Sequence, residues 1–161
     1  MSKDIRKLID DNWDEIKELI IEKVEAEQKP NTIWDLSVGD KADYYRLYSE
    51  GDVAKLSFDC YYDEKSREAG NAFLTEEEAK FELERRKIEA ILRKYSRPFK
   101  KEEQNWYLYY SCNIIDNIIN TGVVYEINPG VPLFETKEIA QQVIDKIGKD
   151  RLEKYWFGVK E

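Results

Sequence analysis

Residues 71–97 read N-A-F-L-T-E-E-E-A-K-F-E-L-E-R-R-K-I-E-A-I-L-R-K-Y-S-R, and this stretch decides the fold. Thr75 and Glu78 have the spacing of a capping box, in which each side chain bonds a backbone amide at the other end. Pro98 follows and disfavours helix in the residue before it. The stretch therefore predicts a short extended lead-in and then a capped helix over residues 75–97. Its expected buried face consists of Phe81, Ile88, Ile91, Leu92 and Tyr95.

Composition predicts a folded, cytoplasmic protein. The chain has 161 residues, 42 % of them hydrophobic and 13 % aromatic, and carries a formal net charge of −8. No apolar run approaches the roughly 20 residues that span a membrane. Acids among the first residues are also unlike a signal peptide. Cys60 and Cys112 lie far apart, so we expect free thiols in a reducing compartment.

Residues 1–29 predict an amphipathic helix ahead of an α+β domain in residues 30–161. Pro30 ends the helical pattern. The pattern fits a helix packed on its own domain, and it equally fits one that pairs with a copy of itself or with a partner. Its apolar residues recur every three or four positions: Ile5, Ile9, Trp13, Ile16, Ile20 and Val24.

The rest of the chain alternates between strand and helix signals. Residues 44–48 and 53–58 predict a hairpin closed by Ser49-Glu50-Gly51-Asp52, with a loop or short helical turn over 60–70 and a short strand at 72–73. Further strands are expected at 106–112, within 114–127 and at 131–134. Two turns are plausible within 114–127: Asp116-Asn117 and Asn120-Thr121-Gly122.

A second capped helix is expected over residues 137–147, ended by Gly148. The lead-in F-E-T-K-E-I-A at 134–140 echoes F-L-T-E-E-E-A at 73–79, which we interpret as one shared device and not as a duplication. Together these signals predict an α+β fold, in which an antiparallel sheet is flanked by two or three helices behind the N-terminal helical extension.

Residue types argue against an enzyme, a cofactor or a metal site. The chain contains no histidine, which removes the commonest general base and the usual zinc ligand. Neither glycine-rich phosphate-binding motif is present. The spacing of Asp59, Asp63 and Glu64 does not match an EF-hand calcium loop. We expect a non-enzymatic protein.

Two charged stretches are candidate binding sites. The acidic stretch predicts either ordinary surface or a negative face that docks on a basic nucleic-acid channel of a protein; interleaved aromatic residues suit such an interface. It comprises Asp35, Asp40, Asp43, Glu50, Asp52, Asp59, Asp63 and Glu64. The basic stretch predicts either a solvated helix face or phosphate contacts. It comprises Arg85, Arg86, Lys87, Arg93, Lys94 and Arg97.

Three motifs carry a resemblance to a known group of proteins. They are G-D-x-x-x-Y-Y (39–45), G-N-x-F-x-T-x-E-E-A (70–79) and A-x-x-x-I-x-x-I-G-x-D-R-L-x-K-Y-x-F-G (140–158). The chain resembles an uncharacterised family of small proteins encoded by bacteriophages and prophages of Gram-positive bacteria. The resemblance implies a shared α+β domain behind variable N-terminal helices, a phage context, and no catalytic residues.

Accessory phage proteins of this size and charge include inhibitors of host defence, among them anti-CRISPR proteins. The leading hypothesis is therefore an inhibitor in the cytoplasm of the bacterial host, whose acidic stretch binds a host protein that handles nucleic acid, such as a CRISPR effector. One alternative is a nucleic-acid-binding accessory protein that uses the basic stretch. Another is a structural oligomer that self-associates through the N-terminal helix.

Overall fold

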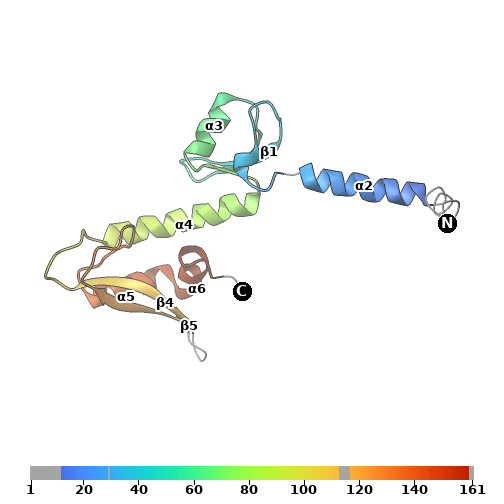
Figure 1. Ribbon diagram of the computed structural model, residues 1–161. Helices are drawn as coiled ribbons and strands as arrows, with labels where there is room; N and C mark the ends of the chain where they lie inside the picture. Colours follow the sequence, from blue (N-terminus) through green and yellow to red (C-terminus); the bar gives the residue numbers. More distant parts are fainter. Residues whose placement is uncertain (1–11, 29, 113–116, 160–161) are drawn as a thin grey trace.

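The central helix α4 spans Glu76–Tyr95 and connects two lobes (Figure 1). The computed structural model describes residues 12–28, 30–112 and 117–159. Thr75 Oγ1 accepts the Glu78 N–H at 3.2 Å, and the Glu78 carboxylate accepts the Thr75 N–H at 3.3 Å. The predicted capping box is thus confirmed. The helix ends at Ser96, whose backbone is extended.

The N-terminal lobe contains an antiparallel sheet of order β2-β1-β3, formed by β1 (Asp43–Leu47), β2 (Val53–Ser57) and β3 (Ala72–Phe73). The predicted hairpin is confirmed, and Gly51 takes the positive φ of 90° that its turn requires. The short helix α3 (Tyr61–Glu68) occupies the stretch expected as a loop or helical turn, and a 3-10 turn, η1 (Ile33–Asp35), precedes the sheet. The small core of this lobe contains Leu36, Tyr44, Phe58 and Ala72.

The C-terminal lobe contains a second antiparallel sheet of two strands, β4 (Asn105–Cys112) and β5 (Asn117–Val124). The predicted turn at Asn120-Thr121-Gly122 is wrong, because β5 runs through it; the other candidate turn includes Asp116, outside the described residues. The expected strand at 131–134 is reduced to two isolated bridges, Arg97 with Leu133 and Trp106 with Phe134. Helix α5 (Lys137–Ile147), helix α6 (Lys149–Arg151) and a π-helical segment η2 (Leu152–Trp156) complete the lobe.

Helix α4 takes part in the packing of both lobes. It contacts β1, β2 and β3 of the N-terminal lobe, and α5 and η2 of the C-terminal lobe. Ile88 and Leu92 are fully buried in the C-terminal core, whereas Phe81 remains 37 % exposed beside the Tyr155 ring. The predicted apolar face is therefore confirmed in its C-terminal part. The core is completed by buried residues of the sheet, the bridging segment, α5 and η2: Leu108, Ile119, Phe134, Ala140, Val143, Ile144, Ile147 and Leu152.

The two lobes share a local unit that recurs along the chain. Phe73 pairs with Tyr45 of β1, and Phe134 bridges Trp106 of β4; each residue of the second pair follows its counterpart by 61 residues. Both pairings are antiparallel, and each leads into a helix whose N-cap threonine accepts a backbone N–H. The sequence echo therefore marks a repeated supersecondary unit. The unit consists of a strand, its hairpin partner, a short bridging segment and a capped helix. The two cap residues are Thr75 and Thr136.

Helix α2 spans Trp13–Gln28 and projects from the N-terminal lobe (Figure 1). The predicted helix is confirmed over this range, whereas Ile5 and Ile9 lie outside the described residues. Four of its apolar side chains are exposed and Ile16 is half-buried, so the interpretation of a helix packed on its own domain is wrong for the exposed residues. The exposed members are Trp13, Leu19, Ile20 and Ile21.

The predicted α+β class is confirmed, with the strands divided between two small sheets instead of one. Among the described helices, none combines the length and the apolar character that crossing a bilayer requires.

Candidate protein-binding surface

The predicted acidic residues lie in the N-terminal lobe, half of them in its connecting loops and half within η1, β1 and α3. Five of them form what we call the open acids, because they are exposed and make no ion pair with any described residue. The open acids are Asp35, Asp40, Glu50, Asp52 and Asp59. Carboxylates in water ionise well below neutral pH, so this surface is negatively charged under physiological conditions.

Backbone amides hold some of the open acids in place. Asp35 Oδ2 accepts the N–H groups of Asn31 and Thr32 at 2.9 and 2.8 Å, and the Thr32 amide is the main reason that the Asp35 pKa lies below its ordinary value. Asp40 Oδ2 accepts the Ser37 N–H at 2.6 Å. The pKa of Glu50 is also lowered, chiefly by its own backbone N–H. These contacts fix the direction of the carboxylates without neutralising them.

Two other predicted acids are paired with lysine or arginine. Asp43 lies 2.7 Å from Lys55 Nζ across the β1–β2 ladder, with both side chains more than half exposed. Glu64 lies 3.8 Å from Arg67 within α3. An exposed pair such as Asp43 with Lys55 contributes little and exchanges readily with other partners, so Asp43 remains available for binding. The pair of Glu64 is less accessible, because the Arg67 side chain is only 13 % exposed.

The prediction that Asp63 is a partner-binding residue is wrong, because its side chain is buried with 3 % exposure. Its carboxylate accepts the Tyr44 hydroxyl at 2.6 Å, the Arg46 guanidinium, and the backbone N–H groups of Asp59 and Cys60 at 3.0 and 2.9 Å. Burial alone would raise the Asp63 pKa, but these bonds outweigh it and hold the pKa at about 2. Asp63 thus connects the start of α3 with Tyr44 and Arg46 of β1.

One cluster in the described part of the chain has the composition of a metal site. Donor atoms of Asp59, Cys60 and Asp63 lie within 4.8 Å of one another. However, Asp63 already receives four hydrogen bonds, two of them from the backbone that starts α3. The cluster is therefore explained as the start of this helix.

Aromatic side chains accompany the open acids. The Tyr44 and Phe58 rings meet edge to face in the core, at a centroid distance of 5.3 Å. Tyr61 and Tyr62, which follow Asp59 and Cys60, are 61 % and 73 % exposed. Trp34 is 63 % exposed, and its ring stacks on the Arg67 guanidinium. Trp34 was not among the residues predicted from the sequence, although it directly precedes Asp35. Exposed Trp and Tyr beside charged groups are typical of protein interfaces.

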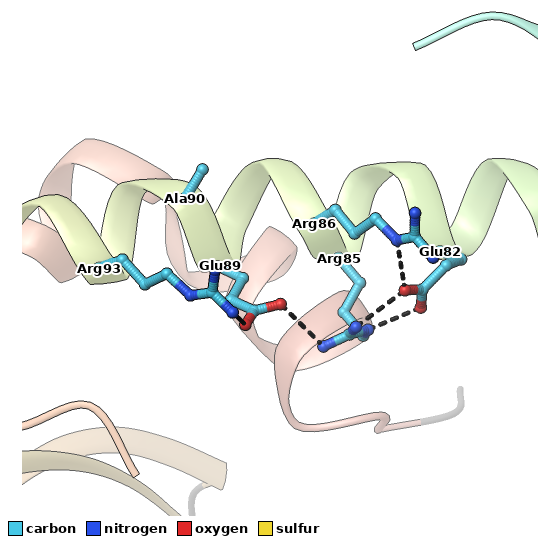
Figure 2. Close-up of a pocket in the computed structure, with 6 residues that line it drawn as sticks. All are labelled: Glu82, Arg85, Arg86, Glu89, Ala90 and Arg93. Carbon is cyan, nitrogen blue, oxygen red and sulfur yellow. Dashed lines mark hydrogen bonds and ion pairs between the residues drawn. The ribbon is translucent and has the colours of Figure 1, made fainter. Parts of the chain in front are cut away.

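The basic stretch lies on α4, where acids of the same helix neutralise it (Figure 2). Arg85 contacts Glu82 at 2.7 Å and Glu89 at 3.5 Å; Arg86 contacts Glu82 at 2.8 Å. Arg93 pairs with the second Glu89 oxygen. The hollow along this face is therefore lined by three arginines and two glutamates that are joined by ion pairs, and Arg93 remains 76 % exposed.

The remaining bases are also engaged. Lys87 pairs with Glu84 at 2.7 Å, and the Lys94 ammonium lies over the Tyr95 ring. The prediction that Arg97 contacts phosphates is wrong, because its side chain is only 13 % exposed and bonds Asn105 Oδ1 and the Gln104 carbonyl. Arg97 is a structural residue of the C-terminal lobe.

Comparisons of the chain with protein-family models, with curated proteins and with solved structures gave no match.

Proposed function

We propose that this protein is a non-enzymatic phage accessory protein that binds a host protein handling nucleic acid and inhibits it through the open acids. The partner surface would be a basic channel, such as the nucleic-acid channel of an RNA-guided nuclease. The phage context is supported by the three motifs quoted above, and the mode of binding by the charge distribution.

One observation carries the proposal: the five open acids of the N-terminal lobe make no ion pair with a described residue, whereas Arg85, Arg86, Lys87 and Arg93 of α4 are held in ion pairs. Asp52 and Asp59 have no cationic neighbour among the described residues, but Arg85 and Arg86 share the carboxylate of Glu82. A basic partner would therefore gain new ion pairs at the N-terminal lobe. Nucleic acid would have to break existing ones at α4, and the overall charge would repel it.

The test removes charge from the proposed surface while preserving its shape. Variant A combines Asp40→Asn, Glu50→Gln, Asp52→Asn and Asp59→Asn. Variant B is the matched control and neutralises the same number of exposed acids elsewhere, by Glu77→Gln, Glu126→Gln, Glu135→Gln and Asp150→Asn. Because both variants lose equal charge, any difference between them reports the location of the surface.

The measurement is affinity capture from a lysate of a Gram-positive host, followed by a nucleic-acid-binding assay with the captured protein. We expect wild type and variant B to retain a nucleic-acid-handling protein and to compete with DNA or RNA for it, and variant A to lose both properties. Capture of such a protein by variant A at wild-type level, or capture without competition, would contradict the proposal.

A second candidate function rests on helix α2. Its exposed Trp13 and Ile20 suit association with another helix, either in a second copy or in the partner. Replacing Ile20 with lysine should then abolish the association. Light scattering of the full chain and of a chain without residues 1–29 checks whether this helix holds copies together.

A further inference from the structure

The outer edge of β5 is free in the described part of the structure. β5 is eight residues long, its sequence is N-I-I-N-T-G-V-V, and it pairs only with β4. It contains neither a charged residue nor a proline, the usual features that keep exposed strand edges from pairing. Figure 1 shows β5 at the border of the C-terminal lobe. The strand therefore offers an unprotected template for another strand.

The ladder geometry identifies the backbone groups on this edge. Trp106 donates its N–H to Phe134 at 3.1 Å and accepts the Phe134 N–H at 2.7 Å, so its peptide groups point away from β5. Its register partner Val123 consequently belongs to a pair without mutual hydrogen bonds. Because hydrogen-bonded and non-hydrogen-bonded pairs alternate along an antiparallel ladder, the peptide groups of Ile119, Thr121 and Val123 all face the free edge.

Thr121, at the centre of this edge, has a polar atom without a partner. Its side chain is 9 % exposed, and its Oγ1 is buried without a hydrogen bond to any described group. The Thr121 N–H donates to Oδ1 of the neighbouring Asn120 at 2.8 Å. This bond satisfies the Thr121 amide as long as no second strand is paired with the edge. A buried hydroxyl without a partner is costly.

We propose that β5 pairs antiparallel with β5 of a second copy about a two-fold axis at Thr121, which makes a continuous four-stranded sheet. With this register Ile119 lies opposite Val123 of the second copy on the core side, and Ile118 lies opposite Val124 on the open side. Every edge-facing peptide group meets a complementary one. The two Thr121 residues lie opposite each other at the axis, a cross-strand pairing that antiparallel sheets accommodate well.

Self-complementarity favours a second copy over a foreign peptide. The eight residues are uncharged, so the two-fold arrangement places no like charges together, and the pairs on either side of its centre, Ile119 with Val123 and Ile118 with Val124, are β-branched and apolar. A C2 contact is isologous, which is the arrangement that a strand paired with itself about its centre produces. This surface is separate from the open acids and from α2, so the proposal does not depend on the proposed function.

Sedimentation equilibrium of the full chain tests the proposal. We expect wild type at twice the chain mass of 19.2 kDa. Ile118→Lys should return the protein to the single-chain mass, because it places a charge beside the paired edge. Ser111→Lys is the matched control: Ser111 is the β4 partner of Ile118 in the sheet but lies away from the free edge, so this variant should remain dimeric. Single-chain mass for wild type, or a dimeric Ile118→Lys protein, would overturn the proposal.

A cross-linking experiment tests the register. In a Cys60→Ser, Cys112→Ser background, Thr121→Cys places two thiols opposite each other at a Cα separation of about 5.5 Å, a distance that a disulfide spans. We expect a disulfide-linked dimer on mild oxidation. Asn120→Cys faces Gly122 of the second copy and should not cross-link. Equal cross-linking of the two variants, or none with Thr121→Cys, would contradict the Thr121 axis.

Discussion

The Asp63 carboxylate and the Arg46 guanidinium form an ion pair beneath the acidic surface, and the Tyr44 hydroxyl binds the same carboxylate oxygen. This pair links α3 to β1, and the same carboxylate accepts the backbone N–H of the open acid Asp59. Truncating one member leaves the other charge buried without its partner, which is far more costly than losing an exposed pair.

Asp63→Asn should therefore lower the free energy of unfolding by about 3 kcal/mol at neutral pH. Urea denaturation followed by fluorescence measures the loss. Asp43→Asn is the control, because its exposed pair with Lys55 should contribute less than about 1 kcal/mol. Equal losses for the two variants would show that burial of Asp63 has no energetic consequence.

The same residue gives the protein an acid-sensitive stability. The Asp63 pKa is about 2 when folded, below the ordinary value of about 3.9 for an unfolded chain. A lowered pKa contributes stability that is fully present above pH of about 4 and is lost as the pH falls toward 2. We expect this contribution, about 2 kcal/mol, to be missing from the pH profile of Asp63→Asn. Parallel profiles for both proteins between these pH values would contradict the assignment.

The repeated unit predicts matched effects at its two helix caps. Thr75→Ala and Thr136→Ala should each lower the free energy of unfolding by about 1 kcal/mol, because each removes the acceptor for one backbone N–H of its helix. Serine at either position should restore most of the loss. Thermal denaturation of the four variants checks this, and an alanine variant as stable as wild type would show that the cap is dispensable.

Tyr107 and Gly122 are cross-strand neighbours whose contact excludes a larger residue. A Cβ at Gly122 would lie 2.9 Å from the Tyr107 ring, so Gly122→Ala should destabilise the C-terminal lobe by displacing that ring. In a Tyr107→Ser background the same change should stabilise instead, by about 0.5 kcal/mol, because alanine loses less backbone entropy than glycine in a strand. A double-mutant cycle in urea measures the coupling, and additive effects would contradict it.

The ion pairs on α4 predict a latent nucleic-acid site. Glu82→Gln with Glu89→Gln releases Arg85, Arg86 and Arg93 from their carboxylates (Figure 2). The double variant should bind DNA or RNA at low salt, with an affinity that falls steeply as salt rises. Wild type should show no such binding in a gel-shift assay. Failure of the variant to bind would mean that the stretch lacks the spacing for phosphates.

Local signals accounted for much of the fold. The cap at Thr75, the hairpin around Gly51 and the helix ended by Gly148 each depend on neighbouring residues, and all three are present in the structure. The turn within β5 was mispredicted because Asn120-Thr121-Gly122 has turn composition, whereas its conformation is set by pairing with Tyr107 and Tyr109 across the sheet. Such pairing is not visible in the local sequence.

The candidate surface was predictable in its composition but not in its accessibility. Asp63 and Asp59 look equivalent in sequence, yet one is buried and the other exposed, because only Asp63 reaches Tyr44 and Arg46 on β1. Similarly, the pairing of the α4 arginines depends on rotamers that helical spacing permits but does not require.

Helix α4 acts as a spacer of fixed length between the two lobes. It has 20 residues, which at 1.5 Å per residue is about 30 Å, and it contacts elements of both lobes. The acid-rich lobe and the lobe with the unpaired strand are thereby kept at a set separation. A binding partner that contacts both lobes must have two contact regions separated by a matching distance. The length of α4 therefore contributes to the choice of partner.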